Sequence, residues 1–174
     1  MKELAEVRQT ERQLVLYDVF MAFDKVTYGD ISFALGDIGK RTLQRDIKDL
    51  KDAGLVYVKY SKCERAYIDA GMPAGEISYK NNMSRKKIQH LKRLRRLAFC
   101  MSLVNDTDPV KTYFEKFPEA SEKMRQRDFE TLRNIGYEAG YNRNWGKYSI
   151  SDGFVSPYDG YGIFIENGKR IRYL

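Results

Sequence analysis

The chain has 174 residues, of which 43% are hydrophobic and 13% aromatic, so it can fold into one ordinary domain or two small ones. It carries 31 Lys and Arg against 24 Asp and Glu, and this net charge of +7 points to a polyanionic partner, most commonly nucleic acid. A single histidine, His90, argues against a Ser-His-Asp triad or a multi-histidine metal site. We therefore expect no enzyme activity, no metal and no cofactor.

The cysteines and the apolar runs indicate a cytoplasmic protein. Cys63 and Cys100 show no C-x-x-C spacing, so neither a disulfide framework nor a zinc ribbon is predicted. The longest apolar run, residues 97–104, is too short to cross a bilayer. We expect a cytoplasmic, nucleoid-associated protein with no membrane partner.

The first half of the chain predicts three helices followed by a two-stranded hairpin. Thr27 or Asp30 can cap the second helix, and Gly54 stands where the third would end in a left-handed conformation. This order is that of a winged helix-turn-helix domain. The helices are expected at residues 7–23, 27–35 and 40–53, and the strands at 56–60 and 65–68.

The third predicted helix has one apolar and one polar face. At about 100° per residue, Leu43, Ile47 and Leu50 lie on the apolar face, and the polar side chains point away from it. A helix that enters the major groove needs this division, but an ordinary surface helix shows it as well. The pattern alone leaves both alternatives open. The polar face holds Arg41, Gln44, Arg45 and Lys48.

The segment Lys40–Leu55 resembles the recognition helix of DeoR-like winged helix-turn-helix regulators, notably those that precede a WYL domain. The resemblance covers about residues 7–68, and Gly39 departs from it, since the family often has Ser there. No Trp-Tyr-Leu tripeptide occurs, so we expect no ligand switch of the WYL kind and no small-molecule ligand. The residues that fit the family pattern are Arg41, Thr42, Arg45, Asp46, Ile47, Leu50, Gly54 and Leu55.

The resemblance implies sequence-specific binding of double-stranded DNA. Asp46 lies nearer the apolar face, and we interpret it as structural. Wing cations are expected to touch phosphates or an adjacent minor groove, although wings are often simply exposed hairpins. The candidate DNA-binding residues are Lys40, Arg41, Thr42, Gln44, Arg45 and Lys48 on the helix and Lys59, Lys62 and Arg65 on the wing.

The second half of the chain repeats the first at an offset of 82 residues. Gln44-Arg45-Asp46, Leu50 and Gly54 recur as Gln126-Arg127-Asp128, Leu132 and Gly136. Helices are expected at 84–104, 108–117 and 119–135, followed by a strand, turn and strand over 137–150. The fold class is therefore predicted as mainly α with small β wings (α+β), with tandem winged helix-turn-helix units and a C-terminal β-hairpin.

The predicted domains follow from this repeat. They are residues 1–72, a linker at 73–83, a second winged-helix-like domain at 84–152, and a hairpin tail at 153–174 around Asn167-Gly168, which favours a type I′ turn. Arg125 takes the place of Leu43, and Glu130 that of Lys48. Either Arg125, Gln126 and Arg127 form a second DNA-binding surface, or the second domain serves as a scaffold for dimerisation or partner binding.

The excess positive charge lies in the second half of the chain. Residues 1–80 hold 13 cations and 13 anions, whereas residues 81–174 hold 18 and 11. A phosphate-binding or inter-domain role is expected for the densest group of cations, with a solvated helix face as the alternative. That group is Arg85, Lys86, Lys87, Lys92, Arg93, Arg95 and Arg96.

Taken together, these features predict a bacterial or phage-type transcriptional regulator, expected to be a repressor. It would bind double-stranded DNA as a homodimer on a palindromic or repeated site. Two alternatives remain open: a plasmid or phage replication initiator, and a winged-helix scaffold that binds DNA non-specifically. A nuclease is disfavoured because the sequence shows no clustered Asp/Glu metal motif.

Overall fold

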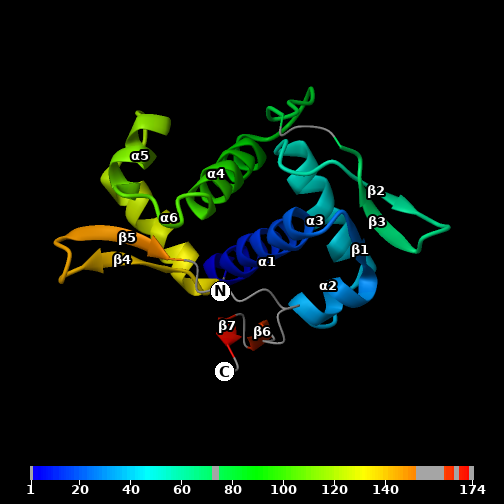
Figure 1. Ribbon diagram of the computed structural model, residues 1–174. Coiled ribbons are helices and arrows are strands. Elements are labelled where there is room, and N and C mark those ends of the chain that lie inside the picture. Colours follow the sequence, from blue (N-terminus) through cyan, green and yellow to red (C-terminus); the bar gives the residue numbers. More distant parts are fainter. Residues whose placement is uncertain (1, 72–74, 152–162, 167–168, 173–174) are drawn as a thin grey trace. The chain divides into compact units, whose positions relative to one another are not determined.

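The computed structural model describes residues 2–71, 75–151, 163–166 and 169–172, with the side chains of 9–71 and 75–151 (Figure 1). The described chain is mainly α with small antiparallel sheets. It divides into two compact units, Met1–Arg95 and Arg96–Leu174. No helix in the described ranges has the length and apolarity that crossing a membrane would need.

The N-terminal unit holds a three-helix core and a small sheet. Its elements are α1 (Lys2–Ala22), β1 (Lys25–Thr27), α2 (Tyr28–Leu35), α3 (Lys40–Asp52), β2 (Val58–Ser61), β3 (Ala66–Asp69) and the first part of α4 (Arg85–Met101). The sheet order is β1-β3-β2, and all its pairs are antiparallel. The short β1 was not predicted. The fully buried core side chains include Leu14, Leu16, Ile31 and Leu50.

Local signals fix where α2 and α3 begin and end. Of the two predicted caps, Thr27 is the N-cap of α2, and Asp30, at the third helical position, completes a capping box with it. After α3, Gly54 adopts a φ of +72°, and its N–H donates to Lys51 O at 2.9 Å. The N–H of Leu55 donates to Leu50 O at 2.9 Å, which completes a Schellman motif. A Cβ at Gly54 would come within 2.6 Å of the Gly75 carbonyl oxygen, so this position needs glycine for space as well as for its backbone.

The second unit repeats the order of helices and hairpin, but its described residues contain no counterpart of β1. It holds the rest of α4, then α5 (Pro109–Lys116), α6 (Glu122–Asn134), β4 (Glu138–Asn142) and β5 (Lys147–Ser151), with β4 and β5 antiparallel. The tail forms an antiparallel hairpin of β6 (Ile163–Glu166) and β7 (Lys169–Arg172), as expected from the sequence. The Asn167-Gly168 turn lies outside the described residues.

The two units resemble each other more in structure than in sequence. Helices α3 and α6 both have 13 residues, and the first begins at Lys40, the second 82 residues later at Glu122. The helix ends also correspond, because the N–H of Gly136 donates to Arg133 O at 3.1 Å and that of Tyr137 to Leu132 O at 3.0 Å. Both units are thus winged helix-turn-helix units, as the fold class predicted.

The wings repeat at an offset of 81 rather than 82. Tyr60 and Tyr67 are cross-strand partners with ring centroids 5.2 Å apart. Tyr141 and Tyr148 form the same edge-to-face pair at 5.5 Å in the second wing. Edge-to-face aromatic pairs stabilise a small sheet beyond the area they bury. The stretch from Gly136 to Tyr141 is therefore one residue shorter than the stretch from Gly54 to Tyr60.

The boundary between the units lies inside α4, between Arg95 and Arg96, and not in the predicted linker. Within residues 73–83, the part from Gly75 onward packs against the end of α3. The N–H of Gly75 donates to Gly54 O at 3.0 Å, and that of Ser78 donates to Asp52 O at 2.8 Å. The described part of this segment is therefore an integral part of the first unit.

Candidate nucleic-acid interface

The outer face of α3 is polar and open to solvent. Arg41, Gln44, Arg45 and Lys48 are exposed along it, and Lys40 is exposed at its first turn. Thr42 is half-buried. A major-groove helix needs side chains that can donate to guanine O6 and N7 and both donate to and accept from adenine, and arginine and glutamine are the residues suited to these tasks. The structure thus places five of the six candidates from this helix on its exposed surface.

The inner face of α3 anchors the helix through both apolar and charged side chains. Leu43, Ile47 and Leu50 are buried, as the spacing predicted. Asp46 is only 1% exposed, and its carboxylate accepts from Arg12 Nε at 2.5 Å and from Arg12 Nη2 at 3.2 Å. A two-point arginine–carboxylate pair fixes orientation as well as distance. Asp46 therefore holds the rotation of α3 about its own axis.

A buried amide extends this anchor to α4. Gln13, which is fully buried, donates to Asp46 Oδ1 at 3.0 Å and to Asp49 Oδ2 at 3.1 Å. Lys87, from the first part of α4, pairs with Asp49, and His90 Nε2 donates to Gln13 Oε1 at 2.8 Å. Polar groups in a core are stabilising only when they are satisfied, as they are here. This network joins α1, α3 and α4 behind the exposed face.

His90 should make the stability of the protein depend on pH. Desolvation by burial lowers the pKa of His90 below its ordinary value, and although Asp49 and Asp46 favour the charged form, Lys87 and Arg93 oppose it. His90 therefore binds a proton more readily in the unfolded chain than in the folded protein. Its contribution to the free energy of unfolding is fully present above about pH 6.5, and it is lost as the pH falls from there toward the lower pKa of the folded state. A His90→Gln variant keeps a donor for Gln13 but cannot titrate.

We expect urea unfolding at pH 7.5 and pH 5.5 to show a smaller acid-induced loss of stability in His90→Gln than in the wild type. Equal losses in the two proteins would mean that His90 does not titrate in this window. The wild-type free energy of unfolding at pH 7.5 is the reference for both comparisons.

Several of the clustered cations on α4 have structural partners. Lys87 pairs with Asp49, Arg95 Nη1 donates to Ala53 O at 2.8 Å at the end of α3, and Arg96 Nε donates to Asp128 Oδ2 at 2.9 Å in the second unit. A cation at a helix C-terminus also interacts favourably with its dipole. Each of these three residues stabilises its own unit internally, a role that the sequence analysis did not consider. Arg85, Lys86 and Lys92 are exposed, and Arg93 is half-buried.

A small hollow lies beside α3 in the first unit. It has a volume of about 300 Å³, and its acidic members, Asp46 and Asp49, are the ones already paired with Arg12 and Lys87. The two remaining cations, Arg45 and Lys48, belong to the exposed face of α3. Positive charge therefore predominates at the rim. The lining residues are Gln9, Arg12, Arg45, Asp46, Lys48, Asp49 and Lys87.

The first wing exposes its predicted cations. Lys59 lies on β2, and Lys62 and Arg65 lie in the turn before β3, where Arg65 has a φ of +52°. Cys63 is also exposed in this turn. Lys25 pairs with Glu64 across the wing, so one turn carboxylate is neutralised. The wing thus presents three exposed cations.

Arg125 must be removed from the candidate DNA-binding residues. It is 1% exposed, and its guanidinium carbon lies 4.9 Å from the ring centroid of Phe129 and 4.6 Å from that of Tyr148. Glu122 pairs with its guanidinium at the surface. Because the position faces the core, as Leu43 does, the aliphatic stem packs inside and the charge lies against aromatic rings. A side chain held in this way does not reach a base edge.

The other candidates of the second unit are exposed. Gln126 and Arg127 lie on the outer face of α6, and so does Glu130. Lys123 is exposed at the position that corresponds to Arg41. Lys123 was not among the predicted residues. The repeat offset of 82 residues, extended to the first turn of the helix, places it at the position of Arg41.

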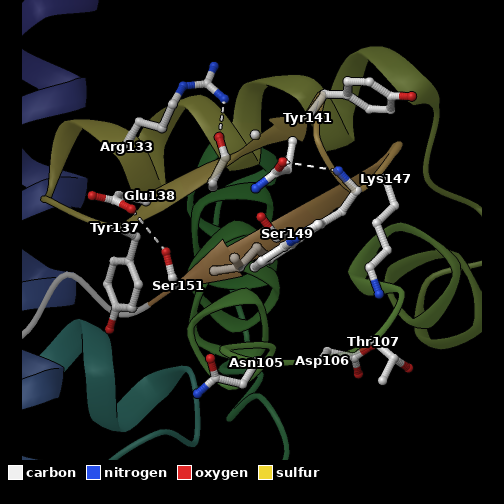
Figure 2. Close-up of a pocket in the computed structure, with 15 residues that line it drawn as sticks. Asn105, Asp106, Thr107, Arg133, Tyr137, Glu138, Tyr141, Lys147, Ser149 and Ser151 are labelled. Carbon is white, nitrogen blue, oxygen red and sulfur yellow. Dashed lines mark hydrogen bonds between the residues drawn. The ribbon is translucent and has the colours of Figure 1, made fainter.

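An open hollow of about 1170 Å³ lies along the second wing (Figure 2). Its walls come from residues 105–107 and from both wing strands, and exposed Tyr141 and Trp145 contribute aromatic surface. The hydrogen bonds drawn in Figure 2 join residues of the lining to one another. Arg133 donates to Ala139 O at 2.7 Å, and Ser151 donates to Glu138 Oε2 at 3.2 Å. The hollow is thus a broad, shallow surface between a loop and a hairpin.

The described residues contain no group of three or more His, Cys, Asp and Glu side chains placed to hold a metal ion.

Comparison of the chain with protein-family models, with curated proteins and with solved structures finds no match.

Proposed function

We propose that the protein is a sequence-specific, double-stranded DNA-binding transcriptional regulator, acting as a repressor, whose helix α3 lies in the major groove. The observation that carries the proposal is the division of α3 between an exposed donor-rich face and a buried face fixed by the Arg12–Asp46 pair. A rigidly held helix with exposed arginine and glutamine side chains has the geometry that direct base recognition requires.

Each exposed residue then has a task that its chemistry suits. Arg41 and Arg45 contact guanine O6 and N7, and Gln44 contacts adenine N6 and N7. Lys40 and Lys48 bind phosphates at the groove edges, where Thr42 can add a hydroxyl contact. The wing cations, Lys59, Lys62 and Arg65, bind the backbone or the adjacent minor groove. A homodimer would place two copies of α3 on a palindromic site.

The test is selection from a pool of randomised duplexes with the full chain. We expect one motif to be enriched, bound ~10³-fold or more tightly than a scrambled duplex at the same salt concentration. Binding to the motif should weaken with salt, with a slope of about −0.9 per phosphate contact. Equal affinity for the motif and the scrambled duplex would contradict the proposal and would favour a non-specific scaffold acting through cations such as Arg85 and Lys92.

The tandem units also support a second candidate, a plasmid or phage replication initiator. Both functions begin with DNA binding and differ in the next step. A repressor blocks transcription from a promoter that carries the selected motif, whereas an initiator binds repeated origin sequences and recruits replication proteins. Transcription from such a promoter in the presence of the protein distinguishes the two.

A further inference from the structure

Helix α6 is held in its unit in the way that α3 is held in the first. Asp128 is 1% exposed, and its Oδ2 accepts from Arg96 Nε at 2.9 Å and from Tyr113 Oη at 2.9 Å. Arg96 lies on α4, the first helix of the second unit, just as Arg12 lies on α1, the first helix of the first unit. In each unit, a buried aspartate at the same helical position pairs with an arginine of the unit's first helix. Asp46 therefore fixes the rotation of α3, and Asp128 fixes that of α6.

Because the inner faces correspond, the outer faces correspond as well. Arg41, Gln44 and Arg45 of the first helix have their counterparts in Lys123, Gln126 and Arg127, which are all exposed. The glutamine and the second arginine present the same donors and acceptors to a groove, and Lys123 keeps the positive charge of Arg41 but not its two-point geometry.

The wing beside α6 also carries groups suited to nucleic acid. Arg143 and Lys147 are exposed near its turn, and Trp145 is 67% exposed between them. Cations bind phosphates, and an exposed indole can pack against a sugar or a base edge. The second unit therefore has both parts of a winged-helix DNA surface, the helix and the wing.

We propose that α6 is a second base-contacting helix, so that one chain contacts two related DNA elements, one through each unit. This inference rests on the proposed function of α3. It assigns Lys123, Gln126 and Arg127 to the second element and leaves Arg125 in the core. The occupant of the α6 face is duplex DNA, because Gln126 and Arg127 repeat Gln44 and Arg45 at the same helical positions and not because of net charge.

Several exposed positions differ between the two helices, among them Lys40, Arg41 and Lys48 of α3, which correspond to Glu122, Lys123 and Glu130 of α6. The exchange of Lys48 for Glu130 is the one that most distinguishes the two elements. A lysine donates to guanine or to phosphate, whereas a glutamate accepts from cytosine N4 and repels phosphate. The two elements should therefore share the base pairs contacted by the glutamine and arginine and should differ where Lys48 and Glu130 act.

The experiment is selection from randomised duplexes with the full-length wild type and three variants, Arg45→Ala, Arg127→Ala and Glu130→Lys. The wild type should enrich two related elements within one duplex. Arg127→Ala should remove base preference from one element and Arg45→Ala from the other, each with a roughly 5- to 150-fold loss of affinity for the wild-type site. Glu130→Lys should remove the base preference at one position of the α6 element, because a lysine there binds phosphate as Lys48 does.

Three outcomes overturn the inference in distinguishable ways. If Arg127→Ala and Glu130→Lys return the wild-type motif with wild-type affinity while Arg45→Ala degrades it, α6 does not contact bases and only α3 does. If Arg45→Ala degrades both elements, a homodimer with two copies of α3 occupies them. If the wild type enriches nothing, the proposed function itself fails. Thermal unfolding by circular dichroism should be unchanged in all variants, since the three side chains are exposed.

Discussion

Replacing Arg41 and Arg45 together by alanine is expected to weaken binding to the selected duplex by ~30- to 10⁴-fold. Each arginine can make a two-point contact with guanine, and the loss of one such contact costs about 1 to 3 kcal/mol. The two positions are one helical turn apart on the exposed face of α3, so both reach the same few base pairs. The measurement is a binding titration on the selected duplex and on a scrambled one.

The control removes the same charge elsewhere. Lys111 and Lys116 are exposed on α5, which is not one of the two helices proposed to contact bases. Changing both to alanine lowers the net charge by as much as the double arginine variant does. We expect this variant to bind the selected and scrambled duplexes in nearly the wild-type ratio. If the α5 variant loses as much specific affinity as the α3 variant, charge and not base contact governs binding.

Asp46→Ala is expected to lower the free energy of unfolding by about 3 kcal/mol, at the low end of the range for breaking a buried ion pair. The change leaves Arg12 without its carboxylate, and it removes an acceptor from fully buried Gln13. The Arg12 side chain is 28% exposed, so water can partly replace the lost partner, which keeps the loss away from the upper end of that range.

Urea unfolding followed by far-UV circular dichroism measures this loss. Asp37→Ala is the matched control, because Asp37 is an exposed aspartate in the turn before α3 and its change should alter stability by no more than ~0.5 kcal/mol. Similar stabilities for Asp46→Ala and Asp37→Ala would show that the pair with Arg12 does not anchor α3.

The parts of the fold that depend on local signals were predictable. Thr27, Asp30 and Gly54 mark helix ends because capping involves only neighbouring residues, and the two faces of α3 follow from helical periodicity. The strand β1 could not be found because a three-residue strand has no usable alternation. Its formation depends on pairing with β3, far along the chain.

The charged residues show where sequence reasoning reaches its limit. A cation is normally assigned to the surface, so Arg125 was interpreted as a candidate base contact. Its burial depends on Tyr148, which the wing brings to its side from 23 positions further along the chain. Arg95 likewise meets the carbonyl of Ala53 only once α3 and α4 have packed. The repeat placed Arg125 at the buried position of Leu43, but nothing in composition or spacing identifies the tertiary partners that accept its charge there.

The offset of 81 residues in the wings, beside 82 in the helices, has a consequence for engineering. A deletion within one strand would reverse the faces of all residues beyond it, but here both strands moved together and kept the tyrosine pair in register. The junction before the hairpin thus tolerates a change of length, so residues can be inserted or deleted there without changing which side chains of the wing lie opposite one another.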